Sequence, residues 1–175
     1  IDTAAVAELQ GLPQVTISRA AHAQEHSLEV QLPFLQAMLA DFKLLPLAVG
    51  DASPIEVAEV IERLWGGPET LIVISSDLSH FLDYRTAQAI DGATLRQILT
   101  LEGGISHHQA CGATSVNGLL LATRGKGLHP RLVAQCNSGD SAGDRHRVVG
   151  YASIAFIESA PVNAPTTASE YAHVQ

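Results

Sequence analysis

The chain has 175 residues, of which 46% are hydrophobic and 16% charged, so it suits one domain with an ample core. Its formal net charge of −8 argues against nucleic acid and anionic membranes as partners. The apolar runs are too short to span a bilayer, no signal peptide is visible, and two cysteines make no disulfide framework. These features together predict a reduced, cytoplasmic protein.

Apolar spacing, caps and breakers predict alternating helices and strands in the first part of the chain. Pro33 lies inside one helical pattern and is expected to break or kink it. The expected elements, in chain order, are a helix from Asp2 to near Gly11, a strand over 15–18, a helical region over 23–40, a strand over 43–49 and a helix from Pro54 to Trp65.

The apolar run Leu71-Ile-Val-Ile predicts a strand buried on both faces, as in a parallel sheet. Strands and helices continue to alternate after it, which predicts an α/β domain over residues 1–158 with a mostly parallel or mixed sheet. The remaining elements are helices over 83–99 and 111–123, strands over 132–136 and 148–157, and a disordered tail over 159–175.

A polar cluster follows the apolar run, with Asp77 and His80 three residues apart. Ligands of open α/β sheets bind outside the carboxyl ends of the strands, and a carboxylate can fix the tautomer of an imidazole and raise its basicity. The alternative is an N-cap for the next helix together with a surface histidine. One cap explains one polar residue but not the whole cluster, so the sequence favours the functional interpretation.

Two further groups of residues carry chemistry. Glu25 and His26 lie in a histidine- and glutamate-rich segment, which is either functional or simply a helix start that favours a carboxylate. Cys111 precedes a helix, where a thiolate becomes a good nucleophile or soft metal ligand, although a buried, inert cysteine is the commoner case. Cys136 fits a strand pattern and is expected to be a small core residue, not a partner for Cys111.

The loop Asn137-Ser-Gly-Asp-Ser-Ala-Gly-Asp144 is similar in composition to a calcium loop. It lacks the glutamate at the twelfth position and the flanking helices of an EF-hand. A turn held by hydrogen bonds from Asn and Asp side chains is therefore expected.

Four motifs in this order resemble the Memo family, also known as AmmeMemoRadiSam system protein B. They are Glu25-His-Ser-Leu-Glu-Val-Gln-Leu-Pro-Phe, Ile74-Ser-Ser-Asp-Leu-Ser-His, Cys111-Gly, and Asn137-Ser-Gly-Asp-Ser-Ala-Gly-Asp followed by Val148-Val-Gly-Tyr-Ala-Ser. The resemblance covers about residues 1–158. It implies the three-layer α/β/α fold of class III extradiol dioxygenases and, as partners, a small molecule or peptide and the radical SAM protein of the same system.

The resemblance also implies the roles of individual residues. Cys111 stands at a metal-ligand cysteine, and His80 at a pocket histidine that is both a ligand and the acid or base. Asp77 lies beside it as a second catalytic residue, and Glu25 and His26 belong to a motif near the same cleft, where they contact substrate. The implied metal is iron or copper, and the implied class is a dioxygenase-like oxidoreductase of unknown substrate.

The chain departs from the family pattern in two places. The Pro-His-Ala-Gly motif and the second histidine motif of the family, which supply two imidazole ligands, are not found. Cys111-Gly is followed by Ala113-Thr-Ser and not by residues such as Arg-His-Pro. The chain is therefore expected to represent the C-terminal portion of a Memo-type domain, with the missing ligands on an upstream segment or chain.

Three functional classes stay open at this point. The first is the metal-dependent oxidoreductase, and the second is a non-catalytic pocket that binds a peptide or partner protein. The third is hydrolysis by a Cys111 nucleophile with His80 as the base. Fold analogy does not decide between them.

Overall fold

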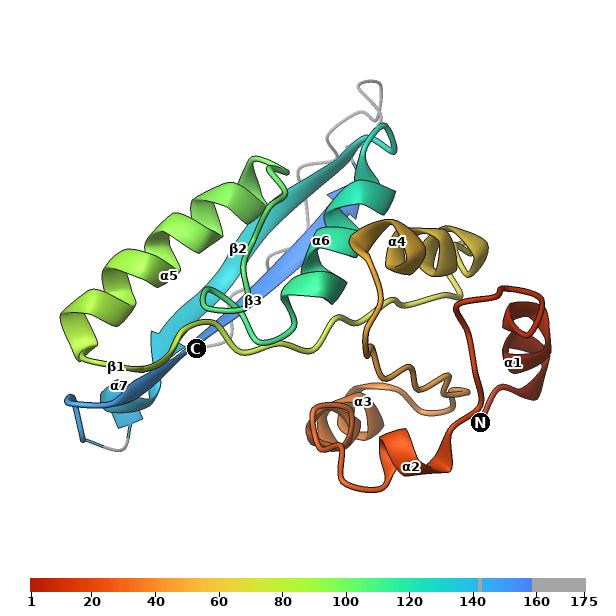
Figure 1. Ribbon diagram of the computed structural model, residues 1–175, viewed down its shortest axis with the longest axis horizontal. Coiled ribbons are helices and arrows are strands. Elements are labelled where there is room, and N and C mark those ends of the chain that lie inside the picture. The colour runs from red at the N-terminus through yellow and green to blue at the C-terminus, as the bar shows by residue number, and fades with distance from the viewer. Residues whose placement is uncertain (142, 159–175) are drawn as a thin grey trace, which may run out of the picture.

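The computed structural model describes residues 1–141 and 143–158, and it combines helices with a small sheet (Figure 1). The predicted tail over 159–175 lies outside the described residues. The elements are α1 (Thr3–Leu9), α2 (Arg19–His22), the 3₁₀ helix η1 (Glu29–Gln31), α3 (Leu32–Met38), α4 (Pro54–Arg63), β1 (His80–Leu82), α5 (Tyr84–Leu99), α6 (Ala113–Thr123), β2 (Leu128–Asn137), α7 (Ser138–Ser141) and β3 (Val148–Glu158).

The sheet within the described residues is antiparallel, with the strand order β1-β3-β2. Strands β2 and β3 form a long ladder that runs from Leu128 opposite Glu158 to Asn137 opposite Gly150. The two strands predicted over 132–136 and 148–157 are therefore confirmed, and the chain is a mixed α/β structure. The mostly parallel sheet and the three-layer arrangement are not confirmed.

Helix α5 lies along β2 and β3, as Figure 1 shows. The carboxylate of Asp83 caps it by accepting hydrogen bonds from the N–H groups of Arg85 and Thr86. Its apolar stripe is buried, with Ala87 and Leu95 among the least exposed side chains of the chain. The helix predicted over 83–99 is thus confirmed, and it packs on strands β2 and β3 of the sheet.

Helices α4 and α6 pack against each other. Ser53 and Glu56 form a capping box at the start of α4. Pro54 is tolerated in the first turn because a backbone N–H at that position would have no acceptor within the helix. A side chain on Gly118 of α6 would collide with Val57 of α4, so glycine at this position permits the close approach. The helix predicted over 111–123 is confirmed as α6.

The segment Leu71–Ile74 forms no strand, which corrects the sequence prediction. Ile72 and Ile74 pack on the α4–α6 core, whereas Leu71 is 68% exposed and Val73 44% exposed. The side chains still alternate as in a strand, but only one face is buried. A β-strand requires neighbouring N–H and C=O groups, and in the described part of the chain no backbone group pairs with this segment.

The strands predicted over 15–18 and 43–49 are also wrong: the carbonyl of Leu44 accepts one hydrogen bond from the N–H of Asp2, but no ladder forms beside either segment among the described residues. The break predicted near Pro33 is confirmed, since Pro33 stands in the first turn of α3 and η1 precedes it. Helices α1 to α3 lie apart from the sheet and are linked to it by irregular segments (Figure 1). No helix in residues 1–141 and 143–158 has the length and apolar character needed to cross a membrane.

Candidate functional site

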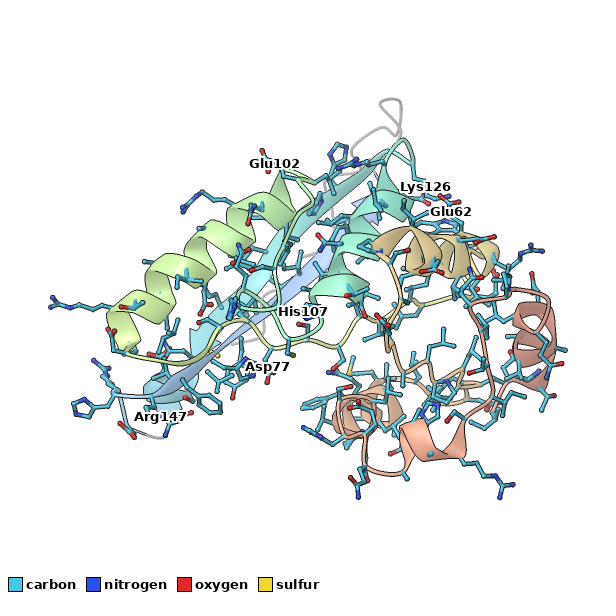
Figure 2. All side chains as sticks on the ribbon, viewed as in Figure 1. Glu62, Asp77, Glu102, His107, Lys126 and Arg147 are labelled. Atoms are coloured by element: carbon cyan, nitrogen blue, oxygen red, sulfur yellow. The ribbon has the colours of Figure 1, made fainter. Side chains whose placement is uncertain are left out.

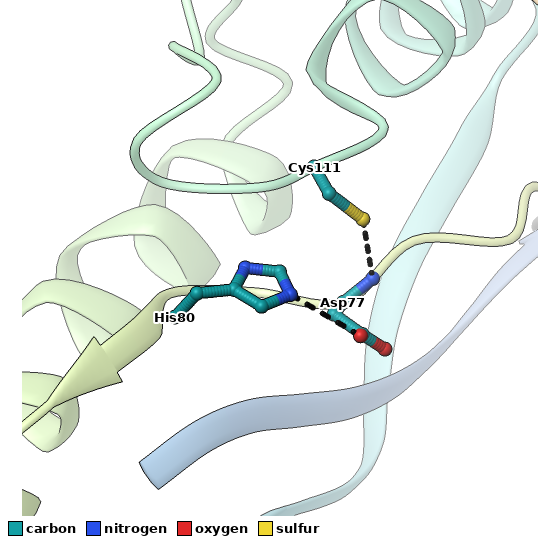
Figure 3. A group of neighbouring side chains, drawn as sticks. All are labelled: Asp77, His80 and Cys111. Carbon is teal, nitrogen blue, oxygen red and sulfur yellow. Dashed lines mark hydrogen bonds and ion pairs between the residues drawn. The ribbon is translucent and has the colours of Figure 1, made fainter. Parts of the chain in front are cut away.

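The polar stretch after Leu71–Ile74 is fixed to strand β3 by backbone hydrogen bonds. Leu78 N–H donates to the carbonyl of Gly150 at 2.8 Å, and Gly150 N–H donates to the carbonyl of Ser79 at 2.9 Å. Asp77 and His80 flank this pairing. The Nε2 atom of His80 lies 3.4 Å from Oδ2 of Asp77, and both side chains are partly exposed (Figure 3). The structure therefore pairs the two side chains that the sequence singled out.

Cys111 reaches this pair from the loop before α6. Its N–H donates to the carbonyl of Asp77 at 3.2 Å, and its Sγ accepts from the N–H of Asp77, also at 3.2 Å (Figure 3). The hydroxyl of Ser76 also lies beside the thiol, with its Oγ 3.7 Å from Sγ of Cys111. Backbone contacts in both directions thus hold the sulfur against the Asp77 segment.

Gly112 explains how the cysteine loop can come so close. A Cβ atom at this position would lie 2.8 Å from Cβ of Ser76 and 3.1 Å from the carbonyl oxygen of Ser75. The N–H of Gly112 also donates to Oγ of Ser76 at 2.9 Å. Ser76 and Gly112 are site residues that sequence reasoning did not assign. The available signal was a glycine directly after the candidate cysteine.

Asp77, His80 and Cys111 each offer one ligand atom, and these atoms lie within 4.8 Å of one another. An ion in tetrahedral coordination, with bonds of about 2.0–2.3 Å, holds its ligand atoms about 3.3–3.8 Å apart. The side chains therefore need only a small inward movement to reach a common ion. Carboxylate oxygen, imidazole nitrogen and thiolate sulfur together suit a divalent transition metal better than Mg²⁺ or Ca²⁺.

His107 lies next to this group but is not part of it (Figure 2). Its Nδ1 is 3.1 Å from the carbonyl oxygen of Cys111, and its Nε2 is 3.3 Å from Oγ1 of Thr114. Both ring nitrogens are therefore occupied by contacts with the cysteine loop and the start of α6. This arrangement makes His107 a support for the loop that carries Cys111.

Glu25 and His26 lie in the loop between α2 and η1. The carboxylate of Glu25 accepts a hydrogen bond from the N–H of Ser27 at 2.7 Å, and this bond lowers the pKa of Glu25 below its usual value. The loop is fastened beside the site, because Oγ of Ser75 donates to the carbonyl of Ser27. Neither side chain belongs to the group of three, and their substrate contact stays a prediction.

Tyr151 on β3 lies within the electrostatic reach of Asp77. Partial burial, together with the negative charges of Asp77 and Cys136, raises the pKa of the Tyr151 hydroxyl above its usual value of 10.0. Cys136 is exposed and both cysteines are free, so the expectation that Cys136 is a core residue is wrong. Its strand, β2, lies at the edge of the sheet that the described residues form.

The loop after β2 is held by the expected hydrogen bonds from Asn and Asp side chains. Oδ1 of Asn137 accepts from the N–H of Gly139 at 2.9 Å, and Oδ2 of Asp140 accepts from the N–H of Asn137 at 2.9 Å. Oδ1 of Asp140 also accepts from the hydroxyl of Tyr84 at 2.6 Å. Both carboxylate oxygens of Asp140 thus accept hydrogen bonds from the chain, which confirms the expected turn held by Asn and Asp side chains.

Comparison with known proteins gives a consistent result. Residues 1–155 match the family described as Memo-like protein. The chain is 38% identical over 149 residues to a MEMO1 family protein of Archaeoglobus fulgidus, covering 78% of this chain and 56% of that relative. It is 35% identical over 147 residues to a MEMO1 family protein of Methanosarcina mazei, covering 76% and 55%. The chain thus spans a little over half the length of these curated relatives.

Proposed function

The chain belongs to the Memo-like protein family, and on that premise we propose that it binds a divalent metal ion through Asp77, His80 and Cys111. The observation that carries the proposal is the convergence of three different ligand atoms within 4.8 Å. Exposed acidic residues gather often by chance, but a sulfur, an imidazole and a carboxylate from two segments 34 residues apart in the chain do so rarely. Asp77, which the sequence suggested as a catalytic residue, is here the third ligand.

The proposed metal is iron or copper, and the proposed activity is a metal-dependent oxidation of an unknown small molecule or peptide, in a domain whose proposed fold resembles that of the dioxygenases. When bound, such a metal would supply one-electron or oxygen chemistry. The mixed ligand set is compatible with either metal, because imidazole binds both iron and copper and the soft thiolate favours copper. Replacing a dioxygenase carboxylate by the Cys111 thiolate makes the ligand set softer, which favours a reaction different from that of the dioxygenases.

The chain's own residues have distinct roles in this proposal. Asp77 orients the His80 ring through the 3.4 Å contact. His80 is 32% exposed, and in this role its ring nitrogen that does not bind the metal moves a proton to or from a bound molecule. The Glu25–His26 loop, held beside Ser75, is the proposed contact for the remainder of that molecule.

A further part of the proposal concerns completion of the site. Three protein ligands leave open positions, and firm structural sites use four. We infer that the segment of the relatives that this chain does not match supplies additional imidazoles, either in the same polypeptide or in a separate one. The backbone of Leu71–Ile74, which pairs with no other segment in the described residues, is a suitable edge for extra strands, which would convert the small sheet into the expected three-layer fold.

The test is calorimetric titration of the chain with Fe²⁺, under anaerobic conditions, and with Cu²⁺. Cys111→Ser is expected to abolish binding, because a hydroxyl is not deprotonated at neutral pH and is a poor ligand for soft metals. Cys136→Ser is the matched control, since Cys136 is also a free, exposed cysteine but lies outside the group. Equal affinity in wild type and Cys111→Ser would refute the site.

A second candidate function is recognition of a peptide or partner protein without catalysis. The observation that favours it is the exposure of aromatic side chains near the polar cluster, with Phe81 at 62% and Tyr151 at 39%. Metal content separates the two functions. Wild-type protein that binds neither metal, yet retains a peptide whose binding is weakened by Phe81→Ser, would favour this alternative.

A further inference from the structure

Asp91, on helix α5, is a carboxylate that the site description has not used. It is only 2% exposed, although acidic side chains are almost never fully buried unless they are paired. In the described part of the chain it makes no ion pair. Its one hydrogen bond is accepted by Oδ1 from the backbone N–H of Ser79 at 3.0 Å. Burial of a carboxylate is unfavourable, so its presence at this position requires a specific explanation.

The Ser79 peptide is the connection between Asp91 and the candidate site. Ser79 lies between Asp77 and His80, and its carbonyl accepts from the N–H of Gly150. A Cβ atom at Gly150 would collide with the carboxylate of Asp91, so glycine is what allows helix α5, strand β3 and the Ser79 peptide to meet. Asp91 and Gly150 thus bind the Ser79 peptide through its N–H and its C=O respectively.

The chain also needs to be held at this point. Phe81, directly after His80, has a φ of 58°, in the left-handed region that side chains with a Cβ rarely adopt. Such a conformation persists only when the surrounding contacts determine it. The hydrogen bond from Ser79 to Asp91 lies two residues before that bend, and Arg147 covers the ring of Phe81 on the other side.

We propose that Asp91 is a positioning residue, which holds the Ser79 peptide so that the imidazole of His80 faces Asp77 and Cys111. The proposal rests on the proposed metal site for its functional importance, but its geometry can be measured without metal. The hydroxyl of Ser79 is itself buried and has no hydrogen-bond partner in the described residues. Asp91 therefore contacts Ser79 through the backbone N–H and not through the serine hydroxyl.

The experiment compares four variants of the full chain. Asp91→Ala removes the acceptor, Asp91→Asn keeps an acceptor oxygen of the same shape, and Ser79→Ala keeps the peptide N–H. Ile98→Ala is the structural control, because Ile98 is buried on the same helix but remote from Ser79 in the contacts it makes. In metal-free protein, imidazole ¹⁵N shifts report the tautomer and environment of His80, and His80→Ala assigns the signal. Titration with Co²⁺, followed by its visible absorption, reports the assembled ligands.

Asp91→Ala is expected to move the His80 signal and to lower Co²⁺ affinity about 10-fold, as loss of partners that orient ligands does in other metal sites. Asp91→Asn should recover most of both, and Ser79→Ala should change neither. The proposal is overturned if Asp91→Ala leaves the His80 signal in place, or if Ile98→Ala moves it equally. Absence of Co²⁺ binding in wild type would instead refute the proposed function, while the His80 signal still tests Asp91.

A second measurement covers the case in which Asp91→Ala does not fold. The Ser79 amide proton should exchange with solvent more slowly in wild type than in Asp91→Asn, because a carboxylate is a stronger acceptor than an amide. Equal exchange rates at Ser79 in wild type and Asp91→Asn would overturn the proposal.

Discussion

Replacing Gly112 by alanine tests the close approach of the cysteine loop to the Asp77 segment. Gly112 has φ −88° and ψ 30°, outside the left-handed region that favours glycine, so the main cost of alanine is expected from the contacts of the added Cβ atom. That atom would lie 2.8 Å from Cβ of Ser76, 3.0 Å from its Oγ and 3.1 Å from the carbonyl oxygen of Ser75. The serine hydroxyl can rotate away, but the backbone carbonyl cannot, so the loop must shift.

The magnitude follows from two opposing effects. Overpacking by one methyl group costs about 1–3 kcal/mol, whereas replacing glycine restricts the unfolded chain and recovers about 0.4–1 kcal/mol. We therefore expect a net loss of about 1 kcal/mol or more. For a chain of this length each kcal/mol lowers Tm by roughly 2–4 °C.

The assay is thermal unfolding by circular dichroism, with amide exchange at Asp77 as a local measurement. The Asp77 N–H donates to the sulfur at 3.2 Å, so its exchange should accelerate when the loop moves away. Gly50→Ala is the matched control, because nothing lies within 4 Å of a Cβ built there. If Gly112→Ala is as stable as Gly50→Ala and Asp77 exchange is unchanged, the reasoning about close approach is wrong.

Two further predictions concern the pH dependence of stability and the cysteines. Hydrogen bonds from the N–H and hydroxyl of Ser53 lower the pKa of Glu56 below its ordinary value of 4.5, so their stabilisation is complete above about pH 4.5 and is lost as the pH falls through the lowered pKa. Glu56→Gln should flatten the acid limb of a Tm-against-pH curve, whereas Glu62→Gln, for which the structure shows no side-chain hydrogen bond, should follow wild type. Because Cys111 and Cys136 are free and exposed, alkylation of the folded, unreduced chain should modify both thiols, and recovery of a single disulfide per chain would contradict the structure.

Local features of the chain were predictable because short-range chemistry determines them. Asp83 caps α5 and Ser53 caps α4, since a side-chain oxygen beside free N–H groups needs no distant partner. The spacing of Ala87, Leu95 and Ile98 likewise fixed the buried face of α5. The family resemblance, carried by short motifs that include Asp77, His80 and Cys111, is confirmed by the comparisons.

The sequence therefore determined where helices α4 and α5 begin, and it singled out Asp77, His80 and Cys111, which the structure brings together, along with Glu25 and His26, which lie outside that group. Only the tertiary structure decided the pairing of strands, because a ladder depends on which backbone groups lie alongside, and Leu71–Ile74 has none beside it in the described residues. It also brought Gly112, Asp91 and Gly150 into contact with the Ser76–Ser79 segment. These residues come from segments that are far apart in the chain. The spacing of residues along a sequence does not show which distant segments meet in the fold.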